Sequence, residues 1–159
     1  MRLLILGTGG MANNHATYFS QIPGVELVAA VDVDDVVVRG FALRHNIPLS
    51  FTSLDDAIAW GEFDAAANVT PDAIHHPTSL KLLAAGKHVF CEKPLAANYA
   101  KAAELADAAE KAGLAAMVNL TYRHVAPLQA AREMVLSRMI ATVRPLHASL
   151  LQTSSVSTP

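Results

Sequence analysis

The chain has 159 residues, of which 52% are apolar and 16% are charged, and its formal net charge at pH 7 is -2. This length fits one domain, or one domain with part of a second, and is sufficient to bury a sizeable core. The lysines and arginines are scattered and balanced by acidic residues, which excludes the basic surface needed to bind nucleic acid.

Cysteine content and the start of the chain bear on location. Cys91 is the only cysteine, so no internal disulfide can form. Met1 and Arg2 lead directly into an apolar strand, with no cleavable leader and no apolar run long enough to cross a membrane. We therefore expect a cytoplasmic protein without a membrane partner.

The first predicted element is a strand at 2–6, apolar without alternation, as in strands buried on both faces of a parallel sheet. It ends in a turn whose small residues at 7, 9 and 12 have the spacing of a dinucleotide-binding turn. Glycine permits a positive φ at 7 and a close approach to a pyrophosphate at 9, and alanine lets the next helix lie against the sheet. The helix at 10–20 would direct its free N–H groups at the phosphates. The predicted pyrophosphate site consists of Gly7, Thr8, Gly9, Gly10, Met11 and Ala12.

The second predicted strand, at 25–31, ends at Asp32, which lies twenty residues beyond Ala12. An acidic residue about 20 residues past the turn is where this fold presents a carboxylate to the ribose hydroxyls. The carboxylate would repel a 2′-phosphate, and no lysine or arginine follows before Arg39. The predicted cofactor is therefore NAD, with NADP less favoured.

The rest of the chain to residue 120 alternates between helices and strands. The helix after Asp32 has Asp34 or Asp35 as its N-cap, and we expect it to be short or partly covered because Val36 to Val38 are β-branched. The alternation predicts an α/β fold, a doubly wound parallel (Rossmann) sheet. The expected elements are helices at 35–46, from 53, at 74–85 and at 98–112, and strands at 63–69, 88–91 and 115–120.

Ligands of such sheets lie at the carboxyl ends of the strands. This rule adds three groups of residues to the glycine turn and Asp32, namely Thr70 with Pro71, Glu92 with Lys93, and the stretch 121–123. A solvated turn is the alternative explanation for Glu92 and Lys93.

Together these residues resemble a known family. The motifs are Gly7-x-Gly9-x-x-Ala12, Asp32, Thr70-Pro71 followed by His75, Glu92-Lys93-Pro94, and Tyr122-Arg123. They are similar to the N-terminal half of the glucose–fructose oxidoreductase/inositol dehydrogenase (Gfo/Idh/MocA) family, over about residues 1–152, and the run at 86–95 is the most specific part.

The resemblance implies a domain that binds NAD(P) and a small-molecule substrate, a sugar, cyclitol or derivative whose secondary alcohol is oxidised or reduced. It implies that Lys93 is catalytic beside the nicotinamide, where an ammonium would stabilise a developing alkoxide. It also implies that Glu92 lies near the nicotinamide ribose and that a cis bond precedes Pro94. Thr70 and Pro71 would pass along the cofactor, and Arg123 would lie near its nicotinamide end.

His75 follows Thr70 and Pro71 at the same edge of the sheet, and we include it among the cofactor-binding residues. Packing or a surface position is the alternative for His75 and for His76. The other histidines show no metal-ligand spacing, so no metal is predicted.

The chain also departs from the family pattern. Members carry a second domain with a catalytic Asp-x-x-x-His pair, which does not occur here, and Thr121 stands where asparagine is common. We predict a dinucleotide-binding domain at 1–122, and at 123–159 the truncated start of a second α+β domain, with a connecting helix at 125–138 and a first strand at 143–152. Such a strand lacks its neighbours, so we expect a homo-oligomer that pairs through it. The alternatives are that this segment is disordered or that a separate polypeptide supplies the missing sheet.

The sequence predicts an NAD(P)-dependent dehydrogenase. We expect the isolated chain to bind the cofactor but to turn over slowly or not at all, because no general acid or base closes the site. A non-catalytic dinucleotide-binding or partner module that reports redox state is the alternative, and a remnant reading frame is a third. The substrate is not indicated, because its contacts would come mostly from the second domain.

Overall fold

The computed structural model describes residues 1–139. By its contacts the chain divides into two units, 1–120 and 121–159. The strand predicted at 143–152 lies outside the described residues.

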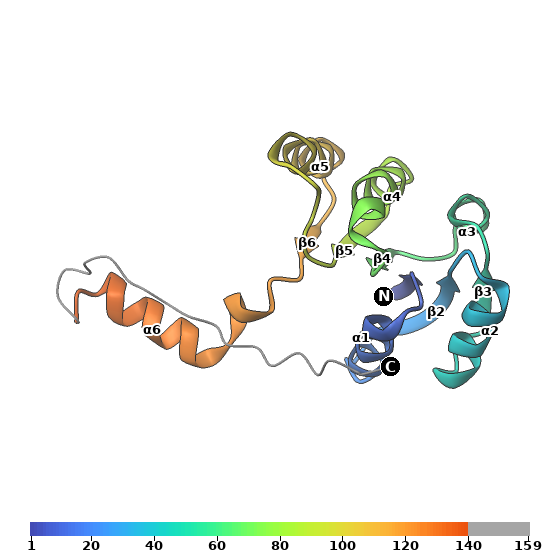
Figure 1. The fold of residues 1–159 in the computed structure, drawn as a ribbon, viewed down its shortest axis with the longest axis horizontal. Coiled ribbons are helices and arrows are strands. Elements are labelled where there is room, and N and C mark those ends of the chain that lie inside the picture. The colour runs from blue at the N-terminus through green and yellow to red at the C-terminus, as the bar shows by residue number, and fades with distance from the viewer. Residues whose placement is uncertain (140–159) are drawn as a thin grey trace, which may run out of the picture. The chain divides into compact units, whose positions relative to one another are not determined.

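The first unit is a six-stranded parallel sheet with the strand order β3-β2-β1-β4-β5-β6. Helices α1 and α2 lie on one face of the sheet, and α3, α4 and α5 lie on the other (Figure 1). This arrangement confirms the predicted doubly wound parallel Rossmann sheet. The strands are β1 (Arg2–Leu6), β2 (Glu26–Val31), β3 (Leu49–Phe51), β4 (Ala65–Asn68), β5 (His88–Cys91) and β6 (Ala116–Val118), and the helices are α1 (Gly10–Phe19), α2 (Asp35–Arg44), α3 (Leu54–Trp60), α4 (Asp72–Ala84) and α5 (Tyr99–Ala112).

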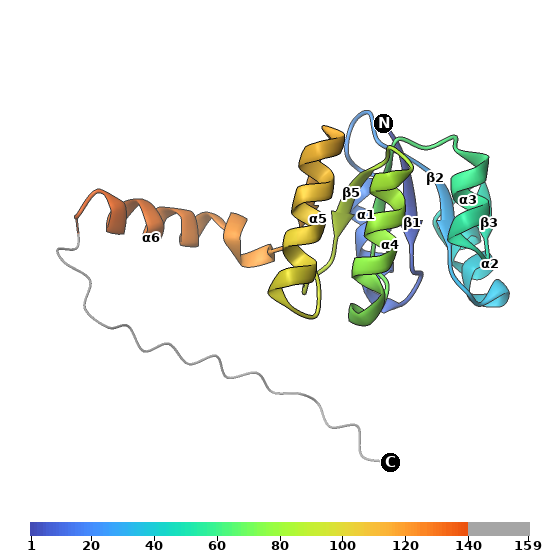
Figure 2. The ribbon, with the colours of Figure 1, turned by 90° about the horizontal axis from the view of Figure 1, so that it is seen from above.

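The core consists of two apolar layers, one on each face of the sheet. Successive strand residues point to opposite faces, and the neighbours Leu4 and Ile5 of β1, both fully buried, accordingly belong to different layers. Leu4 packs in the layer under α4 and α5, which stand side by side in Figure 2. Ile5 packs in the layer that contains Ala16 of α1 and Phe41 of α2.

Helix caps follow the sequence closely. The Asp34 side chain accepts hydrogen bonds from the backbone N–H groups of Val36 and Val37, as an N-cap does. Of the three valines that open α2, only Val38 is buried, and Val36 remains 80% exposed. The helix is short, ten residues, in agreement with the expectation.

Strand β3 was not predicted. It has only three residues, too few for an alternating pattern to be recognised. Its position is set by parallel pairing with β2, in which Ala29 pairs with Leu49 and Val31 with Phe51. Helix α4 also begins at Asp72, two residues before the predicted start.

The second unit contains a 3-10 helix, η1 (Thr121–His124), and the helix α6 (Ala126–Leu136), within the predicted range 125–138. In the part of the chain that the structure describes, no helix combines the length and apolar character that a membrane crossing requires.

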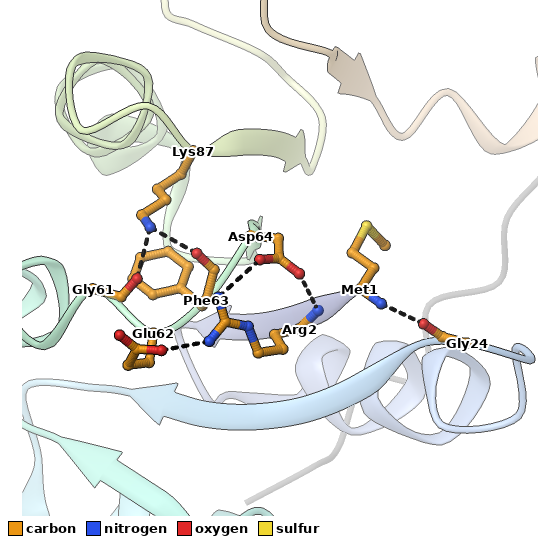
Figure 3. A network of polar contacts seen from close by, with 8 residues as sticks. All are labelled: Met1, Arg2, Gly24, Gly61, Glu62, Phe63, Asp64 and Lys87. Carbon is orange, nitrogen blue, oxygen red and sulfur yellow. Dashed lines mark hydrogen bonds and ion pairs between the residues drawn. The ribbon is translucent and has the colours of Figure 1, made fainter.

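A polar network at the amino edge of the sheet links β1 to the segment before β4 (Figure 3). The Asp64 carboxylate accepts hydrogen bonds from the Arg2 backbone N–H (2.6 Å) and from Arg2 Nη2 (3.1 Å). Arg2 Nη1 lies 2.6 Å from Glu62 Oε2. The Arg2 backbone N–H and then its guanidinium lower the pKa of Asp64 below its ordinary value of 3.8.

Lys87 closes the same edge beside β5. Its Nζ donates hydrogen bonds to the carbonyl oxygens of Gly61 (2.8 Å) and Phe63 (2.7 Å) and lies 4.5 Å above the centre of the Phe63 ring (Figure 3). These contacts hold the amino ends of β1, β4 and β5 together.

The lowered pKa of Asp64 makes an acid-dependent prediction. The ionised carboxylate contributes stability that is present above its ordinary pKa and is lost as the pH falls through the lowered value. Between about pH 5 and about pH 2, Asp64→Asn should therefore lose less unfolding free energy than the wild type, measured by urea unfolding. The exposed Asp107 on α5 provides the control Asp107→Asn, which should follow the wild type. An equally steep loss of unfolding free energy in Asp64→Asn and the wild type as the pH falls would contradict a stabilising role of the Asp64 carboxylate.

Candidate functional site at the carboxyl edge of the sheet

The turn after β1 passes between the ends of the two neighbouring strands. Gly7 has a φ of +86°, and its backbone N–H donates to the Val31 carbonyl oxygen at 2.8 Å. A Cβ at this position would lie 2.8 Å from the Val69 carbonyl oxygen and 2.9 Å from the Thr70 nitrogen. Both the conformation and the space therefore require glycine at 7.

Gly9 is different, because nothing in the described structure occupies the space beside it. Its φ is -70°, and a Cβ added there would meet no atom within 4 Å. Gly9 is also the N-cap of α1, where no side chain caps the helix and no acidic residue stands in the first turn. The first N–H groups of α1 and its positive dipole end are thus available to an anion. A pyrophosphate site at this open cradle stays a prediction.

Asp32 at the end of β2 is fixed by the turn. Its Oδ2 accepts hydrogen bonds from the backbone N–H and the hydroxyl of Thr8, both at 2.8 Å. Partial burial by itself would raise the pKa of Asp32, but these bonds and weaker ones from the Asp34 and Val33 N–H groups outweigh it, and the pKa is lowered. The carboxylate is therefore ionised at neutral pH. Its Oδ1 accepts the longer bond from the Asp34 N–H (3.3 Å).

A cleft of about 340 Å³ opens beside Asp32 and the glycine turn. Its wall is mostly apolar and comes from β1, β2, α3 and the start of α4. Its residues include Gly7, Asp32, Val33, Leu54, Pro71 and Ile74.

Glu92, directly after β5, is a buried carboxylate surrounded by donors. Its Oε1 lies 2.7 Å from His15 Nε2 and 2.6 Å from Asn119 Nδ2, and its Oε2 accepts the Lys93 backbone N–H at 3.1 Å. Burial alone would raise the pKa of Glu92, but the bonds from Asn119, His15 and Lys93 together lower it. The Lys93 side chain is exposed, and the Lys93–Pro94 bond is cis, in agreement with the resemblance.

His75 is buried between two loops, the one after β4 and the one after β5. It is 1% exposed, with Nδ1 2.7 Å from the Pro94 carbonyl oxygen and Nε2 2.7 Å from the Thr70 carbonyl oxygen. The ring lies between the loops after β4 and β5, with one nitrogen facing a carbonyl oxygen of each loop.

Asn68, fully buried at the end of β4, extends this network. Its Oδ1 accepts the Thr70 hydroxyl at 2.7 Å, and its Nδ2 donates to Thr78 Oγ1 (2.8 Å) and Ser79 Oγ (2.9 Å). The amide thus fixes Thr70 to the first turns of α4.

The structure brings most of the predicted site residues to one edge of the sheet. Ala12 is fully buried on the face of α1 that packs against the sheet, where its small side chain allows the close helix packing that the sequence predicted. His75 lies at the same edge but below the surface. Arg123 belongs to η1 in the second unit, where its carbonyl oxygen accepts a hydrogen bond from the Gln129 side chain.

Sequence reasoning missed three polar residues of the site, His15, Asn68 and Asn119. A histidine at 15 shares the buried face of α1 with Ala12 and Ala16, and a polar residue on such a face needs a partner. The two asparagines close β4 and follow β6, so the rule about strand ends would have found them. In residues 1–139 no group of three or more histidine, cysteine, aspartate or glutamate side chains is arranged to hold a metal ion.

Comparison with known proteins agrees with this geometry. A family model described as "Oxidoreductase family, NAD-binding Rossmann fold" (GFO_IDH_MocA) matches residues 1–120. Glucose-6-phosphate 3-dehydrogenase of Bacillus subtilis is 27% identical over 152 residues, which cover 96% of this chain and 43% of that protein. The scyllo-inositol 2-dehydrogenase (NADP(+)) IolU of the same organism is 28% identical over 155 residues, 98% of this chain and 47% of that protein.

Among solved structures, the WlbA dehydrogenase of Chromobacterium violaceum, in complex with NADH and UDP-GlcNAcA, superposes with a TM-score of 0.83 at 27% identity. The match covers 89% of this chain and 41% of that one. The chain therefore spans less than half the length of the relatives it matches.

The two glycines of the turn should respond differently to the same substitution. Gly7→Ala forces a side chain into a left-handed conformation and against the Val69 carbonyl, so it should lower the unfolding free energy by about 2 kcal/mol or more. Gly9→Ala should lower it by only about 1 kcal/mol or less, the usual cost of alanine at an N-cap, because the added methyl group meets open space. Denaturant unfolding measures both, and equal losses would contradict the geometry of the turn.

Proposed function

The chain belongs to the Gfo/Idh/MocA oxidoreductase family, and from this premise we propose that its first 122 residues bind NAD(H) at the carboxyl edge of the sheet. One observation carries the proposal. The open cradle at Gly9 and the ionised carboxylate of Asp32 are joined through Thr8, next to a cleft of about 340 Å³. Together they supply a place for a diphosphate and a partner for a ribose.

Each part of the cofactor has a candidate partner in the chain. The uncapped N-terminus of α1 would hold the pyrophosphate, Asp32 Oδ1 would accept a ribose hydroxyl, and the apolar wall of the cleft would receive the adenine. Thr70 and Pro71 line or adjoin the same cleft, which supports their place among the cofactor contacts.

We favour NAD over NADP because Asp32 is ionised and would repel a 2′-phosphate. One relative is named as NADP(+)-dependent and another is solved with NADH. Our preference for NAD in this chain therefore rests on the charge of Asp32.

For the whole protein we propose hydride transfer between this cofactor and a secondary alcohol of a sugar, cyclitol or derivative. When bound, the nicotinamide supplies the hydride chemistry, which no side chain provides. Lys93, exposed and adjacent to the held carboxylate of Glu92, is the proposed catalytic residue, whose ammonium would stabilise charge on the reacting oxygen. Arg123 near the nicotinamide end stays a prediction.

Other features of the whole protein also stay predictions. These are the division into domains at 1–122 and 123–159, a homo-oligomer formed through 143–152, and a cytoplasmic location.

Gly9→Ala tests the cradle. A methyl group would occupy the space proposed for the pyrophosphate, so NADH should bind at least about tenfold more weakly while the fold is unchanged. Gly40→Ala, an exposed glycine of α2 with equally open surroundings, is the matched control and should bind like the wild type. Isothermal titration calorimetry measures both, and unchanged NADH affinity in Gly9→Ala would refute the cradle.

Asp32→Asn tests the cofactor preference. The wild type should bind NADH about tenfold or more tightly than NADPH, and removal of the charge should reduce this ratio severalfold because the repulsion of the 2′-phosphate disappears. Asp107→Asn serves as the control and should keep the wild-type ratio. Tighter binding of NADPH than NADH by the wild type would reverse the assignment.

A further inference from the structure

His15 is a polar residue in an apolar position. It follows Ala12 on the buried face of α1, and its side chain is 12% exposed. Its ring stacks on Phe19, with centroids 5.6 Å apart and 19° between the planes, and meets Phe90 edge-on at 5.5 Å. A phenylalanine would satisfy this packing, so aromatic contacts alone give no reason for an imidazole.

The polar end of the ring has a specific partner. His15 Nε2 lies 2.7 Å from Glu92 Oε1, and because an ionised carboxylate only accepts hydrogen bonds, Nε2 is the donor. Asn119 Nδ2 donates to the same oxygen at 2.6 Å. Two donors therefore fix Oε1. Within residues 1–139, Oε2 accepts only the Lys93 N–H at 3.1 Å, so it keeps capacity for a further donor.

This contact joins two distant parts of the site. α1 begins at the glycine turn that we assign to the pyrophosphate, and Glu92 adjoins Lys93 in the loop that we assign to the nicotinamide end. His15 and Glu92 are 77 residues apart in the sequence. The hydrogen bond between them therefore fixes the loop after β5 relative to α1.

We propose that His15 is a positioning residue, which acts through its Nε2–H···Oε1 bond to hold Glu92 with Oε2 directed at the nicotinamide half of the bound cofactor. This inference rests on the proposed function. If it is correct, the binding of the nicotinamide half of the cofactor depends on His15, and the binding of the adenosine diphosphate half does not.

The test compares NADH with ADP, which has no nicotinamide half, by isothermal titration calorimetry of the 159-residue chain. His15→Phe keeps the aromatic packing and removes the donor. It should weaken NADH binding about tenfold, because the proposed hydrogen bond between the charged Glu92 and the nicotinamide half would be lost. ADP binding should weaken by less than about twofold. His15→Gln, whose amide can donate to Oε1, should recover most of the NADH affinity.

A structural role would give a different pattern. Damage to the fold would weaken both ligands together, and either that outcome or an unchanged NADH affinity in His15→Phe would overturn the inference. If His15→Phe does not fold, His15→Leu removes the donor at similar size, and its comparison with His15→Gln gives the same decision.

A second measurement tests whether His15 acts through Glu92. In a Glu92→Ala background, His15→Phe should change NADH affinity by less than about twofold, because the group that His15 positions is gone. A full additional loss there would overturn the inference. A wild-type chain that binds neither ADP nor NADH would overturn the proposed function as well, whereas normal binding of both with an indifferent His15→Phe overturns the inference alone.

Discussion

The exclusion of a side chain at Gly7 sets the path by which the chain leaves the central strand of the sheet. The backbone there donates to the end of β2 while its Cα faces the carbonyl of Val69 beyond β4, so the chain leaves the central strand through a gap that admits no larger residue. From this point α1 crosses to one face of the sheet, and α4 lies on the other (Figure 1). Open parallel sheets bind ligands where the crossovers diverge in this way, and here the cleft opens beside Gly7 and Asp32.

Buried polar groups give the loops of this edge a fixed geometry. Asn68 holds Thr70, His75 lies between the loops after β4 and β5, and three donors surround Glu92. Among the residues that the structure describes, no buried side-chain nitrogen or oxygen lacks a hydrogen-bond partner. A fully satisfied network in a low-dielectric interior is rigid. The edge therefore presents its turn, carboxylate and lysine loop in positions that are set before a ligand arrives.

The sequence predicted those parts of the fold and site that are encoded locally. The glycine spacing, the cap at Asp34 and the apolar strands each depend on neighbouring residues, and they appear in the structure as expected. Strand β3 escaped prediction because its existence depends on pairing with β2 and not on its own three residues. His15 and Asn119 escaped because their role is defined by Glu92, which lies 77 and 27 residues away in the sequence.

The central claim is that a dinucleotide lies with its diphosphate on the open turn and its adenosine ribose at Asp32. The most direct measurement is the change in backbone amide chemical shifts when NADH is titrated into the ¹⁵N-labelled chain. We predict that the largest chemical-shift changes occur at Gly9, Gly10 and Met11 and at the residues that follow β2. Saturable binding with its largest changes at the amino edge of the sheet, around Arg2 and Asp64, would contradict it.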